Sequence, residues 1–174
     1  MVGLGEAIYG AGMGSKIMAY HTVSTGVGGV RIVQEKIDES TIGFEPGKQV
    51  LDIDRSVLGK DKVNSLENLV SGGALEEMRG VKPYEIPQSD EIWNQLAFYL
   101  SRGLHNTITY WSPDRIVLGG SMIVGNPRIM LEDIVRYTQE SLGMILPCPE
   151  IVDGTLEDEG GLYGAMALLK QKLS

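Results

Sequence analysis

The chain has 174 residues and a mass of 18.9 kDa, the size of one ordinary domain, so we expect a single domain over residues 1–174. Asp and Glu total 23 against 15 Lys and Arg, and the formal charge of −8 makes contact with nucleic acid unfavourable. No apolar run approaches the roughly 20 residues of a membrane span. No signal peptide is recognisable and the single Cys148 cannot form an internal disulfide, which favours a cytoplasmic location.

The first third of the chain predicts a helix followed by a small antiparallel sheet. Apolar residues recur at helical spacing from Val2 to Gly12. Residues Lys16–Val23 favour a strand and Val30–Val33 a second strand, with a glycine-rich hairpin bend between them. Residues Gln34–Glu39 continue with a polar turn and a short return strand.

The middle of the chain predicts an irregular segment and then helices. Residues 40–63 mix polar, glycine and charged types, with one apolar run at Gln49–Ile53 that we expect to be an edge strand. Helical spacing resumes at Leu66–Val70 and again at Ser89–Trp111, where Pro113 provides the stop.

The last third predicts two alternating strand and helix units. Arg115–Leu118 has the composition of a short buried strand, and Pro127–Gly143 is an amphipathic helix with proline in its first turn. Pro149–Val152 is another strand, and Leu162–Leu173 a final helix. The order of elements predicts an α/β fold with a mixed sheet flanked by helices.

Three glycine-rich segments are candidate phosphate-binding sites. Gly10–Gly14 resembles a dinucleotide fingerprint, but it follows a helix instead of opening one, so a helix C-cap and turn is the better interpretation. Ser24–Gly29 lies between strands, where its backbone N–H groups could hold a phosphate or the glycines could serve turn geometry alone. Gly119–Ser121 follows a strand, where it could approach a base or ribose or simply form a tight turn. No Gly-Lys-Ser or Gly-Lys-Thr sequence occurs, which excludes a P-loop.

Five motifs occur in a characteristic order along the chain. They are Ser-Thr-Gly-Val-Gly-Gly at 24–29, Gly-Phe-Glu-Pro-Gly at 43–47, Leu66-Glu67 with Ser71-Gly72, Pro-Asp-Arg-Ile-Val-Leu-Gly-Gly at 113–120, and Gly-Gly-Leu-Tyr-Gly-Ala at 160–165. The series resembles the C-terminal, nucleotide-binding domain of glucokinase-like sugar kinases of the ROK family (repressor, open reading frame, kinase). The resemblance implies an actin-like ATPase (ribonuclease-H-like) fold and ATP, with Mg, as the phosphoryl donor to a hexose or amino sugar.

The resemblance also implies which residues bind each substrate. The nucleotide set is Ser24, Thr25, Gly26, Gly28, Gly29, Gly119 and Gly120. The sugar set is Glu45, Lys48 and Glu67, with Lys48 where the family has a histidine. Carboxylates accept hydrogen bonds from vicinal hydroxyls, which suits a hexose. Without the resemblance, either glutamate would be a solvated surface acid.

Two family features have no match in the sequence. The family's structural zinc needs one His and three Cys, but Lys48 and Ser65 stand at two of these positions and Val57–Asn64 contains no Cys, so we expect no zinc. The family's first phosphate loop and the Asp that deprotonates the sugar both precede the position of Glu6. We therefore expect no catalytic residue in this chain, which alone would be inactive and would need an N-terminal lobe in cis or trans.

Three functions remain open at this point. The chain is part of a hexose kinase, the effector domain of a ROK-type sugar-responsive transcriptional regulator, or a binding module without catalysis. The resemblance implies a homodimer, for which the apolar face of Ser89–Trp111 is one candidate surface, although such a face is more often core.

Overall fold

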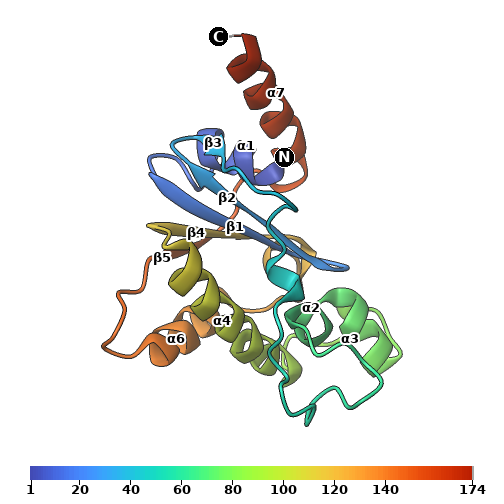
Figure 1. Cartoon of the computed structure of the whole chain (residues 1–174). Helices are drawn as coiled ribbons and strands as arrows, with labels where there is room; N and C mark the ends of the chain where they lie inside the picture. Colours follow the sequence, from blue (N-terminus) through green and yellow to red (C-terminus); the bar gives the residue numbers. More distant parts are fainter. Residues whose placement is uncertain (174) are drawn as a thin grey trace.

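The computed structural model describes residues 1–173 and shows one mixed sheet between two helical layers (Figure 1). The strands are β1 (Ile17–Val23), β2 (Val27–Val33), β3 (Lys36–Ile37), β4 (Arg115–Gly119) and β5 (Glu150–Asp153). Their order in the sheet is β3-β2-β1-β4-β5. The β1–β2 and β2–β3 pairs are antiparallel, whereas β1–β4 and β4–β5 are parallel. The predicted α/β class and its mixed sheet are confirmed.

Helices cover both faces of this sheet. They are α1 (Val2–Tyr9), α2 (Leu66–Val70), α3 (Gly72–Arg79), α4 (Ile92–Trp111), α5 (Ser121–Val124), α6 (Leu131–Leu142) and α7 (Gly160–Leu173), with short 3-10 turns η1 (Pro46–Lys48), η2 (Pro83–Glu85) and η3 (Glu157–Glu159). Helices α1 and α7 lie on one face, α4 and α6 on the other, and α2 and α3 lie beyond one end of β1 and β2 (Figure 1). Within residues 1–173, no helix combines the length and the apolarity needed to cross a lipid bilayer.

The side chains on the two faces of β1 pack into two separate hydrophobic clusters. Met18 and Tyr20 pack in the cluster with α1 and α7, whereas Ala19 and Val23 pack in the larger cluster with α4 and α6. This alternation is the period of two expected of a strand that is covered on both sides. His21 also faces α4, since its Nε2 lies 3.1 Å from the Thr107 hydroxyl oxygen. The sheet is therefore the centre of a three-layer core.

Most predicted elements are confirmed, with shifted ends. Helix α1 ends at Tyr9, and the following glycines form the C-cap and turn that the sequence favours, with the Gly10 amide donating to the Glu6 carbonyl at 3.1 Å. Helix α4 begins at Ile92, whose amide donates to the Asp90 carboxylate at 2.9 Å, and ends at Trp111 as predicted.

The prediction that Pro127 opens a helix is wrong. Helix α6 begins at Leu131, and Pro127 lies in the connection after α5. A backbone hydrogen bond stabilises this connection, because the Ile129 amide donates to the Met122 carbonyl at 2.8 Å. The proline therefore lies in a loop, and this loop lines a pocket.

The predicted edge strand at Gln49–Ile53 is also wrong. Only an isolated bridge joins Val50 to Ser65. Val50 is 54% and Ile53 81% exposed, so their apolar side chains do not face a core that would align a strand. The chain instead turns around Asp52.

Two charged side chains organise the loop at residues 50–64. The buried Asp52 carboxylate accepts hydrogen bonds from the amides of Val57 (3.2 Å) and Leu58 (2.8 Å). The Arg55 guanidinium donates to the carbonyls of Lys60 (3.1 Å) and Lys62 (3.0 Å). In this segment the sequence lacks the cysteines of the family's zinc site, and the contacts of Asp52 and Arg55 give the loop a defined shape.

Replacing Asp52 with alanine should lower the free energy of unfolding by about 2 kcal/mol, since two backbone amides lose a buried, charged acceptor. Urea unfolding of the two proteins measures the difference. Asp61→Ala, an exposed aspartate of the same loop, is the matched control and should change stability by less than about 0.5 kcal/mol. Equal losses in the two variants would contradict the role given to Asp52.

Candidate functional site

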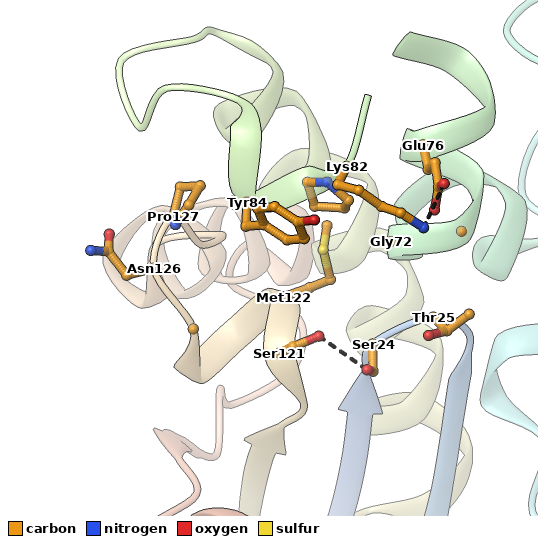
Figure 2. A pocket seen from close by; sticks show the side chains of 13 residues that line it. Ser24, Thr25, Gly72, Glu76, Lys82, Tyr84, Ser121, Met122, Asn126 and Pro127 are labelled. Carbon is orange, nitrogen blue, oxygen red and sulfur yellow. Dashed lines mark hydrogen bonds and ion pairs between the residues drawn. The ribbon is translucent and has the colours of Figure 1, made fainter. Parts of the chain in front are cut away.

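A pocket of about 330 Å³ lies beyond the carboxyl ends of β1 and β4 (Figure 2). Ser24 and Thr25, from the turn after β1, and Ser121, which begins α5, form one side of it. Helix α3, η2 and the loop around Pro127 supply the rest. In open α/β sheets ligands bind beyond the carboxyl ends of parallel strands, so this is the expected position for a ligand.

The hairpin turn between β1 and β2 presents free backbone donors. It consists of Ser24, Thr25 and Gly26, closed by a hydrogen bond from the Ser24 amide to the Gly26 carbonyl at 2.9 Å. Within residues 1–173, the amides of Thr25 and Gly26 have no acceptor. Successive unpaired N–H groups in a turn form a concave site for an anion. The turn thus has the chemistry that the resemblance predicts for contact with phosphates.

The other two glycines of this motif lie in a different place from the one predicted. Gly28 and Gly29 belong to β2 and not to the bend. At position 29 close packing leaves no room for a side chain, because a Cβ there would lie 2.7 Å from Cγ of Pro46. The absence of this side chain lets η1 lie directly against the strand.

Helix α3 is docked on the hairpin turn through its first residues. The amides of Gly72 and Gly73 donate to the carbonyls of Ser24 (2.7 Å) and Thr25 (3.1 Å), and the Ser71 hydroxyl caps the helix by accepting from the Ala74 amide at 3.1 Å. The first helical amides are therefore engaged by the protein. Helix α3 is absent from the predicted elements, and the signal that could have found it is a capping serine before a glycine pair.

The glycine pair at 119–120 forms the tight turn from strand to helix. Gly120 has a φ of 88°, a left-handed conformation that favours glycine, and a Cβ there would overlap the Val23 carbonyl oxygen. A Cβ on Gly119 would overlap the Tyr20 hydroxyl. The turn places Ser121 so that its hydroxyl oxygen lies 3.0 Å from that of Ser24. Both glycines shape the pocket without lining it.

Replacing Gly120 with alanine should lower the free energy of unfolding by about 2 kcal/mol, because the left-handed conformation and the contact with the Val23 carbonyl both penalise a side chain. Thermal or urea unfolding measures it. The matched control is Gly161→Ala in helix α7, where a Cβ meets no atom within 4 Å and alanine should be neutral or stabilising. A stable Gly120→Ala protein would show that the turn relaxes freely.

The structure brings the three predicted sugar residues together. Nζ of Lys48 lies 2.6 Å from Oε1 of Glu67. This hydrogen bond holds the pKa of Glu67 below its ordinary value and raises the pKa of Lys48, to which the charge of Glu45 adds a further increase. Glu45 is exposed and also lines a shallow pocket of about 280 Å³ beside Trp111. These charged groups form a cluster on the surface.

Glu67 connects this cluster to the hairpin turn. Its Oε2 accepts a hydrogen bond from the Val27 amide at 2.9 Å, and a Cβ on Gly26 would lie 2.9 Å from the same oxygen. Thr25, the neighbouring residue of the turn, lines the larger pocket. The tip of the hairpin therefore separates the pocket from the carboxylates.

No group of three or more His, Cys, Asp or Glu side chains within residues 1–173 is arranged to hold a metal ion. The absence of zinc stays a prediction. If Mg accompanies a nucleotide, the phosphates would supply some of the ligands of the metal ion. The other ligands would come from groups that do not form such a cluster within residues 1–173.

Comparison with known proteins places the chain in a family. The model of the ROK family matches residues 1–172, so the chain belongs to the ROK family. The fructokinase of Zymomonas mobilis is 30% identical over 95% of this chain and 58% of its own length. The structure of a ROK hexokinase from Thermus thermophilus matches with a TM-score of 0.84 and 28% identity, over 98% of this chain and 64% of that chain. The chain thus spans about three fifths of the length of these relatives.

Two more distant structures share the fold. A ROK family glucokinase from Streptomyces griseus, in complex with glucose and AMPPNP, matches with a TM-score of 0.76 at 21% identity, over 98% of this chain and 65% of that chain. A ROK family transcriptional regulator, a homologue of the Escherichia coli MLC protein, matches equally well in TM-score (0.76) at 19% identity, over 98% of this chain and 49% of that chain. The actin-like ATPase fold predicted from the resemblance is confirmed.

Proposed function

We propose that this chain is the nucleotide-binding and partial sugar-binding part of a ROK sugar kinase, which transfers the γ-phosphoryl group of ATP to a hexose hydroxyl. The observation that carries this proposal is the hairpin tip, which has the pocket on one side and the Glu67–Lys48 pair on the other. Phosphoryl transfer depends mainly on holding donor and acceptor on opposite sides of the transferred group.

Each side of the hairpin tip has chemistry suited to one substrate. The free amides of Thr25 and Gly26, together with the hydroxyls of Ser24 and Ser121, can donate to phosphate oxygens. Glu67 is ionised and keeps further lone pairs after its contacts with Lys48 and the Val27 amide, so it can also accept from a sugar hydroxyl. Glu45 adds a second carboxylate at the same edge.

The proposal includes the conditions under which the reaction would occur. Mg would accompany ATP, and an N-terminal lobe would complete the site in cis or trans. A homodimer and a cytoplasmic location are part of the same proposal. Because relatives carry the names fructokinase and hexokinase, fructose and glucose are the first sugars to test, followed by amino sugars.

Calorimetric titration of the chain with Mg·ATP tests the nucleotide half. We expect saturable binding, weakened about tenfold in the double variant Ser24→Ala/Ser121→Ala because two hydrogen bonds to phosphate are lost. Ser56→Ala, which removes a hydroxyl from the distant loop at residues 50–64, should leave the affinity unchanged. No binding at millimolar ATP would contradict the nucleotide assignment.

Titration with fructose and glucose, with and without Mg·ATP, tests the sugar half. Glu67→Gln should weaken sugar binding, because it removes both the ion pair with Lys48 and a charged acceptor. A sugar affinity that is unchanged in this variant would show that Glu67 has only a structural role at the hairpin.

The alternative is the effector domain of a sugar-responsive regulator, which the fold shared with a ROK regulator favours. An effector domain needs sugar binding alone, whereas a kinase also needs the nucleotide. Sugar binding without any ATP binding would therefore favour the regulator over the kinase.

A further inference from the structure

The wall of the pocket opposite the hairpin differs from the hairpin side in chemistry. It consists of η2, with Pro83 and Tyr84, and of Met122 and Pro127 across from them (Figure 2). These side chains are mostly apolar, whereas the hairpin side consists of hydroxyls and free amides. Ligand pockets commonly combine apolar walls with a few placed polar groups, and here the two kinds of group lie at opposite ends.

Hydrogen bonds fix the distance between the two apolar parts of this wall, η2 on one side and the segment with Met122 and Pro127 on the other. The side-chain amide of Gln88, just after η2, donates to the Arg128 carbonyl at 2.9 Å and accepts from the Arg128 amide at 2.7 Å. A second pair of bonds closes η2 itself, since the Lys82 amide donates to the Glu85 carboxylate at 2.8 Å and the Glu85 amide donates to the Lys82 carbonyl at 2.9 Å. Both parts of the wall are thus preorganised, and the gap between η2 and the loop around Pro127 forms a slot.

Tyr84 provides an exposed aromatic ring at this slot. Its side chain is 72% exposed, and its ring lies between Pro127 and Lys82 in the view of the pocket (Figure 2). An aromatic ring held at the mouth of a pocket, with no hydrogen bond of its own within residues 1–173, is a platform for a flat ligand. A nucleotide base is such a ligand, and stacking accepts any base because each has a π-face.

An ion pair lies next to Tyr84. Nζ of Lys82 is 2.7 Å from Oε1 of Glu76 on α3, and both residues line the pocket. Because the two charges compensate each other, this end of the pocket offers no unpaired cation for a phosphate. The second oxygen of Glu76 can accept hydrogen bonds from a diol, as a carboxylate does for the ribose in many nucleotide sites.

We propose that Tyr84 stacks on the base of the nucleotide and that Glu76, held by Lys82, accepts a hydrogen bond from a ribose hydroxyl, while the phosphates extend to Ser24 and Thr25. This inference deepens the proposed function and rests on it. It assigns the nucleotide an orientation, and it gives binding roles to residues of α3 and η2 that lie outside the glycine motifs.

Three ligands and matched variants test the assignment by calorimetry on the full chain. The ligands are Mg·ATP, Mg·2′-deoxyATP and inorganic tripolyphosphate. Tyr84→Ala should weaken ATP about tenfold, within the range known for stacking on an aromatic side chain, whereas Tyr84→Phe should retain the affinity. Tripolyphosphate, which reaches only the hairpin, should bind equally to all three proteins.

The ribose contact has its own comparison. Glu76→Gln should reduce the preference for ATP over 2′-deoxyATP several-fold, whereas Glu77→Gln, on the same helix and paired with Lys62 outside the pocket at 2.9 Å, should keep it. Unchanged ATP affinity in Tyr84→Ala, or an equal loss of tripolyphosphate binding, would overturn the inference and leave the proposed function standing. Failure of the unmodified chain to bind ATP would overturn both.

Discussion

Replacing Glu6 with alanine is expected to lower the free energy of unfolding by about 3–5 kcal/mol, because three backbone amides would lose a buried, charged acceptor at once. The Glu6 side chain is only 2% exposed. Its carboxylate accepts from the amides of Ala11 (2.8 Å), Thr155 (2.9 Å) and Leu156 (2.9 Å). It therefore joins the turn after α1 to the loop after β5, segments that are far apart in the sequence.

Urea unfolding of the Glu6→Ala chain measures this loss. Glu6→Gln should be intermediate, since one acceptor oxygen remains. Glu132→Ala, an exposed glutamate on α6, is the control for removal of a carboxylate and should change stability by less than about 0.5 kcal/mol. A loss below about 1 kcal/mol for Glu6→Ala would mean that water satisfies the three amides and that the carboxylate does not hold the two segments together.

Much of the sheet is predictable from local patterns. The alternation along β1 follows from two-sided burial, and the long helix α4 follows from apolar residues such as Leu96, Leu100 and Leu104, which are all buried. The edge strand expected at Gln49–Ile53 fails because apolar composition alone does not say whether a core is present to receive it. Val50 and Ile53 are apolar and nevertheless exposed.

The candidate site also has parts that local sequence patterns predict and parts that they do not. The hairpin turn and the glycine pair at 119–120 could be predicted because each is a contiguous motif with its own backbone requirement. The family resemblance pointed to Glu67 as a sugar-binding residue, whereas its contact with the hairpin came only from the fold. Tyr84 and Glu76 carry no local signal at all, since the pocket forms from segments around residues 24, 76, 84 and 122 that only the fold brings together.

The hairpin tip shows how the fold couples the two halves of the site. Its carbonyls accept from the amides of Gly72 and Gly73 of α3, and on its far side the Val27 amide donates to the Glu67 carboxylate. Helices α2 and α3 are thereby fixed to one turn, which itself keeps free amides for a ligand. A shift of the turn would therefore move its free amides and Glu67 together.

The stability of the chain should fall by roughly 3 kcal/mol as the pH is lowered from about 6.5 to about 4, through His21 alone. His21 is completely buried, and burial lowers its pKa from the ordinary value of 6.5 to about 4. Within residues 1–173 its Nδ1 has no hydrogen-bond partner, while Nε2 lies 3.1 Å from the Thr107 hydroxyl oxygen. The ring also lies 5.5 Å from that of Trp111, and desolvation by burial is what lowers the pKa of His21.

The direction follows from proton binding. Between pH 6.5 and 4 the unfolded chain binds a proton at His21 that the folded chain does not, so acid favours unfolding; the contribution is fully present above pH 6.5 and is lost by about pH 4. Urea unfolding at a series of pH values measures the slope. His21→Gln should remove this part of the slope, whereas His105→Gln, at the only other histidine, should retain it. A pH dependence that is the same in His21→Gln and in the unmodified chain would assign the acid sensitivity to carboxylates instead.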